Sequence, residues 1–264
     1  MRFGCCGAVE DAALFKDLGF DFLEIHIQTL LRGDVDDATW AATAPDVDKV
    51  ALPIEAGNCL VPGSLPLVGP QCDMDALAIY MQRVAARAKK MGLSILVFGS
   101  GGARRRPDDV PAEIAIKQIQ AFTRMAAEAC DKHGVLLVIE HLNKGEDNML
   151  NSLAQVLALH EKVDHRGCQT LVDSFHFGLE NETDQTLLAL GDTLRHVHVS
   201  EVVDRAEPGA HGDDAEKAFD FKHFFSVIKQ LGYDDRMAIE ARWQKPVAEA
   251  GAASLALLKR AWDA

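Results

Sequence analysis

Short apolar runs and longer amphipathic stretches alternate along the whole chain of 264 residues. Runs rich in aliphatic and β-branched residues predict strands, and they cover 2–6, 21–26, 50–56, 94–99, 135–141, 168–173, 194–200 and 236–241. Stretches with helical periodicity or many alanines predict helices between them, over 9–18, 35–43, 72–91, 111–133, 150–163, 183–191, 219–231 and 246–262. Eight strands alternating with eight helices predict an α/β fold, the (β/α)₈ TIM barrel.

Local signals support this pattern. The stretch 111–133 starts with Pro111, carries Glu113 early and runs into Lys132, His133 and Gly134, an order typical of a helix from its first turn to its end. The strand runs are almost continuously apolar, as parallel strands buried on both faces are. We find no linker rich in Pro or Ser and therefore expect one domain over 1–264. A doubly wound sheet is the alternative, but no Gly-rich phosphate motif follows the first run.

Charge and composition narrow the class of protein. The net charge is −13, which argues against a nucleic-acid partner, because binding to a phosphate backbone needs clustered Lys and Arg. The dense basic cluster Arg104–Arg106 lies in the Gly-rich loop 99–107, where we expect either a solvated loop or a phosphate cradle. The six cysteines show no CxxC spacing, and we see no signal peptide or membrane-length apolar stretch. We therefore expect a cytoplasmic protein without a membrane partner; a homo-oligomer is compatible with the sequence.

Four acidic or imidazole side chains stand at the ends of four successive strand runs, VLLVIE, CQTLVD, LRHVHV and MAIE. They are Glu140, Asp173, His198 and Glu240. The carboxyl ends of the strands in a TIM barrel meet on one face, where the chemistry takes place. Such groups are costly to desolvate unless they are paired, and together they could bind one divalent cation. Oxygen and nitrogen donors without sulfur favour Mn²⁺, with Co²⁺, Mg²⁺ or Zn²⁺ as alternatives.

Further polar residues surround these four. Glu146 follows in EHLNKGE and His176 in DSFH, while His196 shares a strand face with His198. One of these two histidines can therefore be a core residue or an outer partner of the metal. Glu24 and Glu55 also reach strand ends, and we expect them to be polar groups on the rim. The loops 58–73 and 99–107 are rich in Gly and Pro and predict lids over a substrate.

The motifs of the chain resemble the sugar isomerase and epimerase superfamily of xylose-isomerase-like barrels, and within it the ketose 3-epimerases look most similar. The resemblance covers nearly the whole chain. It rests on Glu140-His-Leu-Asn-Lys-Gly-Glu146, Asp173-Ser-Phe-His176, His196-Val-His198, Glu240 in MAIEAR, and Asn58-Cys-Leu-Val-Pro-Gly63. These motifs are specific for the superfamily and its metal site, and much less so for the substrate.

This resemblance implies a metal ion held by Glu140, Asp173, His198 and Glu240. It implies that Glu140 and Glu240 are the catalytic pair, which exchange the substrate's proton from opposite sides. Glu146, His176 and a basic residue after strand seven would bind substrate oxygens. The family arginine often falls six residues after the ligand histidine, but position 204 is Asp here, so Arg205 takes this role one position later.

We therefore expect a metal-dependent sugar isomerase or epimerase that acts through an enediolate on a ketose or related sugar. The metal would act as a Lewis acid, and a carboxylate would take the proton next to the carbonyl. A keto-polyol dehydratase on the same barrel is the alternative. An abasic-site endonuclease fits less well because strand three ends in AGN and lacks a ligand histidine. A sugar-binding barrel without activity fits less well because the ligand set is complete.

Overall fold

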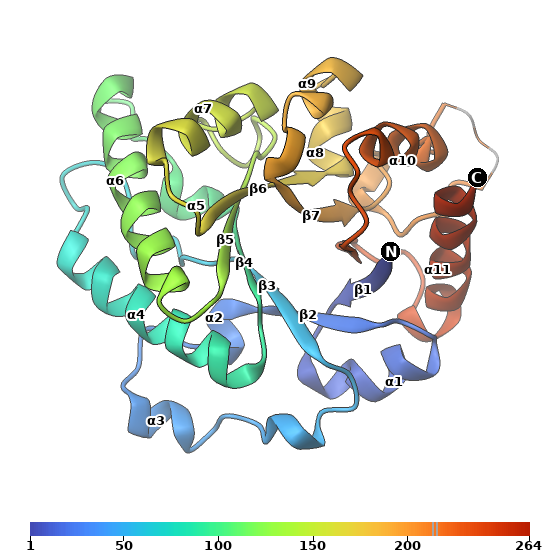
Figure 1. Ribbon diagram of the computed structural model, residues 1–264, viewed down its shortest axis with the longest axis horizontal. Coiled ribbons are helices and arrows are strands. Elements are labelled where there is room, and N and C mark those ends of the chain that lie inside the picture. Colours follow the sequence, from blue (N-terminus) through green and yellow to red (C-terminus); the bar gives the residue numbers. More distant parts are fainter. Residues whose placement is uncertain (213, 215) are drawn as a thin grey trace.

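The computed structural model describes residues 1–212, 214 and 216–264 and shows a closed barrel of eight parallel strands. Each strand pairs with the next along the chain and β1 pairs with β8, so the described sheet has no open edge (Figure 1). The strands are β1 Arg2–Cys6, β2 Phe22–His26, β3 Ile54–Asn58, β4 Ile95–Phe98, β5 Leu136–Glu140, β6 Cys168–Asp173, β7 Leu194–Val199 and β8 Arg236–Ile239. The predicted (β/α)₈ barrel is confirmed.

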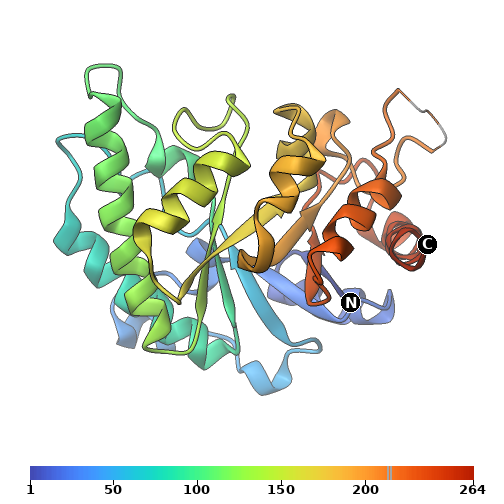
Figure 2. The ribbon, with the colours of Figure 1, turned by 45° about the horizontal axis from the view of Figure 1, so that its top comes forward.

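Helices surround the barrel as an outer ring, which Figure 2 shows from a tilted direction. They are α1 Ala12–Asp17, α2 Ile27–Leu30, α3 Asp37–Ala41, α4 Met74–Met91, α5 Gly101–Arg104, α6 Ala112–Asp131, α7 Leu153–Val163, α8 Ser174–Leu179, α9 Asp184–Leu188, α10 Phe221–Gln230 and α11 Val247–Asp263. The helix α4 shows why these stretches are helical. The Asp73 carboxylate accepts hydrogen bonds from the first backbone amides, and Gly92 ends the helix in the left-handed region (φ 87°).

Two apolar layers hold the fold together. The layer between strands and helices contains α6 residues spaced three or four apart, so one helical stripe is buried; they include Ala115, Ile119, Phe122, Ala126 and Cys130. A smaller cluster fills the inside of the barrel, with members Ala56, Ile95, Val97, Val138 and Leu171. These five lie on four neighbouring strands, β3 to β6. This inner cluster forms the floor on which the polar site is built.

The predicted element boundaries differ most at the third strand. We expected a strand over 50–56, but β3 begins at Ile54. Pro53 has no N–H to donate to a strand ladder, although its carbonyl accepts a hydrogen bond from the amide of Leu23 (2.9 Å). The short helices α5 and α8 lie in segments for which the sequence predicted no helix. The helix α8 directly follows β6, and α5 begins three residues after the end of β4, so both lie beside the carboxyl end of the barrel.

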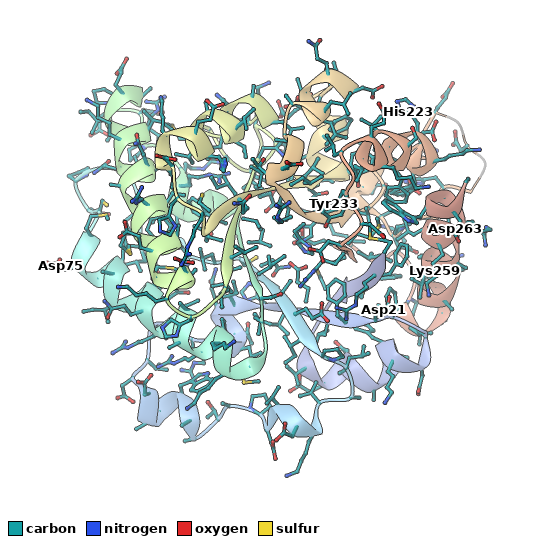
Figure 3. All side chains as sticks on the ribbon, in the orientation of Figure 1. Asp21, Asp75, His223, Tyr233, Lys259 and Asp263 are labelled. Carbon is teal, nitrogen blue, oxygen red and sulfur yellow. The ribbon has the colours of Figure 1, made fainter. Side chains whose placement is uncertain are left out.

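Charged residues lie on the outer faces of several helices, and Figure 3 labels some of them. Asp75 on α4, His223 on α10 and Asp263 on α11 are labelled there and are exposed. Of the helices in the described part of the chain, none is both long enough and apolar enough to span a membrane.

Candidate metal centre and active site

Strand alternation carries two of the predicted ligands into the barrel. Val138 and Glu140 lie two residues apart on β5, and Leu171 and Asp173 lie two residues apart on β6. Side chains two apart on a strand share a face, so each carboxylate continues the inner apolar cluster upward. One donor atom of each predicted ligand lies within 4.8 Å of the corresponding atoms of the other three; the ligands are Glu140, Asp173, His198 and Glu240. The structure thus brings together all four residues that the sequence predicted.

The four side chains contact one another and Arg205. The Nδ1 atom of His198 lies 2.8 Å from Oε2 of Glu240 and 3.4 Å from Oε1 of Glu140. The Nη2 group of Arg205 donates to Oδ2 of Asp173 (2.9 Å) and to Oε2 of Glu240 (2.8 Å). Three carboxylates therefore share one guanidinium and one imidazole.

Glu24 is a fifth member of this cluster, and the prediction that it is a rim group is wrong. It is completely buried on β2. Its carboxylate accepts from Nε2 of His196 (2.7 Å) and from Nε2 of His198 (2.9 Å). A carboxylate held in this way fixes the orientation of a metal-binding imidazole, because it leaves Nδ1 of His198 facing the other three acids. His196 is accordingly the outer of the two histidines.

Glu55, the other expected rim group, lies at the opposite end of the barrel. It is the second residue of β3, and it forms ion pairs with Arg2 and Arg236 at the starts of β1 and β8. The expectation failed because the sequence run was placed four residues too early, which put Glu55 near the wrong end of its strand.

Burial and mutual repulsion set the charge states of the cluster. Burial raises the pKa of Glu140 to about 7, in spite of the lowering effect of His198, and the neighbouring acids add to the rise. Burial also raises the pKa of Asp173, against the effect of Arg205. Burial would raise the pKa of Glu240 as well, but His198 and Arg205 hold it well below its usual value. The two nearby cations therefore offset only part of the negative charge, as expected of a donor set suited to a divalent ion.

Asn58, at the end of β3, supports this arrangement from the side. Its Nδ2 group donates to Oε1 of Glu240 (3.2 Å) and contacts Sγ of Cys6 (3.4 Å). The sequence marked Asn58 only as part of a family motif. Its hydrogen bond to Glu240 comes from barrel closure, because β3 and β8 lie on either side of the β1–β2 pair.

A cavity of about 170 Å³ opens beside the cluster. Glu140 and Glu240 line it together with all three residues predicted to bind substrate, which are Glu146, His176 and Arg205. Both predicted lids also reach it, since Asn58 and Cys59 come from loop 58–73 and Gly99, Ser100 and Gly101 from loop 99–107. The geometry therefore places the predicted binding groups around one small space next to the carboxylates.

His176 presents an unused hydrogen-bond donor to this region. Its Nδ1 atom accepts from the backbone N–H of Asn143 (3.0 Å), and its buried Nε2 has no hydrogen-bond partner among the described residues. Burial, aided by Arg205, lowers the pKa of His176 to about 3, so the ring is neutral near pH 7. A neutral imidazole that accepts at Nδ1 carries its proton on Nε2. That N–H can donate to a substrate oxygen.

Arg205 reaches the site through an unusual turn. Asp204 and Arg205 both have left-handed backbones, with φ of 59° and 51°. Two such non-glycine residues each cost on the order of 1–3 kcal/mol and occur mainly where function requires them. Arg205 lies over the ring of Phe175 (4.8 Å) and pairs with Asp173 and Glu240. Because of this turn, the guanidinium of Arg205 reaches the carboxylates although the residue lies one position later than in the family pattern.

The basic cluster in loop 99–107 is solvated only in part, since Arg105 is exposed, and its three arginine side chains bond protein oxygens. Arg104 is fully buried, donates to Asp147 (2.7 Å) and also bonds the carbonyl oxygen of Glu140 (3.0 Å). Arg105 bonds the carbonyls of Gly145 and Glu146. Arg106 bonds the carbonyl of Val110. All three side chains tie loops to one another, so none is directed at a ligand.

Two glycines in the same loop make space for the site. A Cβ on Gly99 would overlap Oε2 of Glu140, and a Cβ on Gly101 would lie 2.6 Å from the carbonyl oxygen of Glu146. Any side chain at these positions would displace the acidic residues that line the cavity. The Gly-rich sequence after strand four therefore serves close packing against the site.

The fold and the site define a class: a (β/α)₈ barrel with a centre of carboxylates and imidazole at the carboxyl ends of its strands. A sequence profile described as "Xylose isomerase-like TIM barrel" matches residues 12–261. The chain therefore belongs to this family.

Two sequence relatives of the chain are named epimerases. The chain is 26% identical over 240 residues to the 3-dehydro-D-guloside 4-epimerase of Escherichia coli (strain K12), and the match covers 89% of this chain and 87% of the relative. It is 28% identical to the L-ribulose 3-epimerase of Methylomonas sp. (strain DH-1) over 136 residues, 51% of this chain. That match spans only 45% of the relative, about half its length.

Solved structures agree on the fold. A crystal structure of 3-keto-D-glucoside 4-epimerase from E. coli superposes with a TM-score of 0.77 at 20% identity, covering 98% of this chain and 99% of that one. A D-psicose 3-epimerase from Clostridium cellulolyticum H10, solved with D-tagatose, also gives 0.77, at 17% identity and 99% coverage of both chains. At these identities, the likeness establishes the barrel alone.

Proposed function

We propose that this protein is a metal-dependent epimerase or isomerase that acts through an enediolate on a ketose or a related keto-sugar. The observation that carries the proposal is the convergence of four donor atoms from β5 to β8 within 4.8 Å of one another, beside a small cavity. The epimerase relatives support the same reaction class.

The four side chains suit a divalent ion. Glu140, Asp173 and Glu240 would supply oxygens, and His198 would supply Nδ1, which Glu24 keeps directed at them. This donor set favours Mn²⁺, with Co²⁺, Mg²⁺ and Zn²⁺ as alternatives. When bound, the ion would polarise the substrate carbonyl as a Lewis acid.

Glu140 and Glu240 carry out the proton transfer. One carboxylate takes the proton from the carbon next to the carbonyl, and the electrons of that C–H bond move into the enediolate. The two acids come from β5 and β8, which are not neighbours in the barrel. A proton returned by the other acid from the opposite face inverts that carbon and yields the epimer. Return to the neighbouring carbon yields the isomer instead.

Three further residues hold and orient the sugar. The Nε2–H of His176 and the guanidinium of Arg205 would donate to substrate oxygens, and the carboxylate of Glu146 would accept from a hydroxyl. Asn143 fixes both His176 and Glu146, because its backbone N–H bonds Nδ1 of His176 and its side chain donates to Oε1 of Glu146 (3.0 Å). Because these hydrogen bonds fix the side chains of His176 and Glu146, a small sugar can bind in one orientation.

Deuterium exchange tests the proposal. Ketoses, keto-sugar glycosides and sugar phosphates are incubated in D₂O with Mn²⁺, Co²⁺ or Mg²⁺ and followed by NMR. We expect deuterium at the carbon next to the carbonyl and a product of otherwise unchanged mass formula. A product lighter by one water would identify a dehydratase, and the absence of exchange with every sugar would overturn the enediolate mechanism.

A further inference from the structure

A second and larger cavity adjoins the reaction cavity. It measures about 490 Å³ and shares Asn58, Cys59 and Glu240 with the smaller one. It extends from there past the ends of β1 and β2, the helix α2 and the segment that follows α3. The two cavities therefore adjoin at Glu240, one of the two residues proposed for proton transfer.

The two cavities differ in size and lining. The smaller one, about 170 Å³, is lined mostly by residues with polar or charged side chains and suits a single sugar ring. The larger one lies in the range of roughly 300–1,000 Å³ that is typical of sites for larger organic ligands. Its apolar lining residues are Ala8, Val9, Ile25, Leu30, Pro45 and Ala241. A hydroxyl-rich free sugar would leave this surface without a partner.

The charges around the larger cavity exclude an anionic occupant. Glu10, Glu24 and Glu240 line it, whereas no Lys or Arg does so in the part of the chain that the structure describes. A phosphate there would be repelled by the carboxylates and would find no cation. His26 also lines the cavity, and the Nδ1 atom of its ring is within hydrogen-bond distance of the Thr29 hydroxyl (3.0 Å).

We propose that this cavity binds an uncharged, largely apolar substituent of the keto-sugar, such as the aromatic aglycone of a glycoside. The sugar ring reacts in the small cavity, and the substituent passes Asn58 and Cys59 into the large one. This inference rests on the proposed function and narrows its substrate class. It assigns specificity to the segments after β1 and β2, and these carry none of the residues proposed for proton transfer.

The test compares three derivatives of one hexopyranose whose ketone lies away from the anomeric carbon, so that substitution at that carbon leaves the carbonyl free: its phenyl glycoside, its methyl glycoside and its anomeric phosphate. Deuterium wash-in gives kcat/KM for each. We expect the phenyl glycoside to exceed the methyl glycoside by about tenfold, within the range for an added apolar group in a pocket, and the phosphate to be the poorest substrate. Equal values for phenyl and methyl, or a preference for phosphate, would overturn the proposal.

A matched pair of variants locates the effect. Ala8→Trp fills the cavity, while Ala42→Trp adds the same side chain at an exposed position of the C-cap of α3, outside the cavity. We expect Ala8→Trp to remove the advantage of the phenyl glycoside over the methyl glycoside, with Ala42→Trp behaving as wild type. A phenyl advantage that survives Ala8→Trp would place the aglycone elsewhere.

Binding without turnover separates this inference from the proposed function. Saturation-transfer NMR with phenyl β-glucoside, which has no ketone and cannot react by this route, reports contact of the ring protons with the protein. We expect the signal in wild type and Ala42→Trp and its loss in Ala8→Trp. If no keto-sugar exchanges deuterium but this pattern holds, the function fails and the cavity assignment stands. If exchange occurs and the ring shows no contact in wild type, the cavity assignment fails alone.

Discussion

The two ends of the barrel carry charge clusters of opposite balance. At the amino end, Glu55 pairs with Arg2 (2.7 Å) and Arg236 (3.3 Å), and Arg236 also donates to Ser94 (2.6 Å). One carboxylate thus meets two guanidiniums. At the carboxyl end, three buried carboxylates and the partly buried Glu240 share Arg205 and two histidines, and the pKa of Glu140 is raised to about 7.

This difference in charge balance indicates a structural role for the amino-end cluster and a functional role for the carboxyl-end cluster. The amino-end cluster is internally paired and ties together β1, β3 and β8, which stabilises barrel closure. The carboxyl-end cluster leaves a buried donor on His176 and an excess of acid beside a cavity. Such an imbalance weakens the folded state unless a ligand or cation relieves it, and this is typical of a functional site.

The largest expected effect is on turnover at the carboxyl end. Glu240→Gln keeps the side-chain shape but removes a proton-transfer group, so deuterium wash-in at saturating Mn²⁺ should fall by at least ~10²-fold. Saturation must be shown for the variant, because a charged metal ligand is also lost. Glu55→Gln makes the same chemical change at the amino end and should keep the wild-type rate. A Glu240→Gln variant as active as wild type would contradict the assignment of proton transfer to the carboxyl end of the barrel.

Metal should stabilise the protein through the carboxyl end only. At a free Mn²⁺ concentration a hundredfold above Kd, binding should add about 2.7 kcal/mol to the free energy of unfolding relative to EDTA. Urea unfolding measures this gain. Asp173→Asn should lose most of it, whereas Glu55→Gln should retain it. Identical unfolding curves with Mn²⁺ and EDTA for the wild type would contradict a metal site.

A pH effect should come from His141, which follows Glu140. The ring is buried and neither nitrogen has a hydrogen-bond partner among the described residues. Burial, aided by His176, lowers its pKa to about 3. The unfolded chain therefore takes up the proton first, so this residue costs stability as the pH falls below about 6.5.

His141→Leu should remove that cost. Between pH 7 and pH 5, the unfolding free energy of the variant should improve relative to wild type by about 2 kcal/mol. Denaturant unfolding at both pH values, with saturating metal throughout, measures the change. Parallel stability profiles would show that the histidine does not remain neutral in the folded protein.

The smallest effect should come from the amino-end pair itself. Glu55→Gln should lower the free energy of unfolding by about 1 kcal/mol, because its ion pairs are only partly shielded from water. The gap between wild type and variant should shrink as salt rises. A loss that is independent of salt would indicate a packing defect instead of lost ion pairing.

Much of this architecture could be predicted from the residue pattern. Alternating strand and helix periods indicated the barrel, and the polar residues at the ends of strands five to eight predicted the site. This prediction is possible because all strands of a TIM barrel run in one direction, so residues at their carboxyl ends must meet. The period of two along a strand placed His196 and His198 on one face before any distance was known.

Other features depended on closure of the barrel. Glu24 of β2 contacts His196 and His198 of β7, although neither strand neighbours the other. No local pattern encodes which side chains meet across the interior, since this depends on the tilt and stagger of all eight strands. The sequence run therefore made Glu24 look like a rim group, although it is completely buried and bonds both histidines.

Loop geometry was also decided by tertiary structure. The left-handed turn at Asp204 and Arg205 lacks a glycine that would announce it, and its cost is met by the pairing of Arg205 with Asp173 and Glu240. Arg104 looked like a solvated charge until burial against Asp147 gave it a structural role. By itself, the sequence determined the fold, the face and the end at which the acids gather, because these follow from local periodicity. Contacts across the barrel decided which charged side chains are paired with one another and which remain available to bind a cation or a substrate.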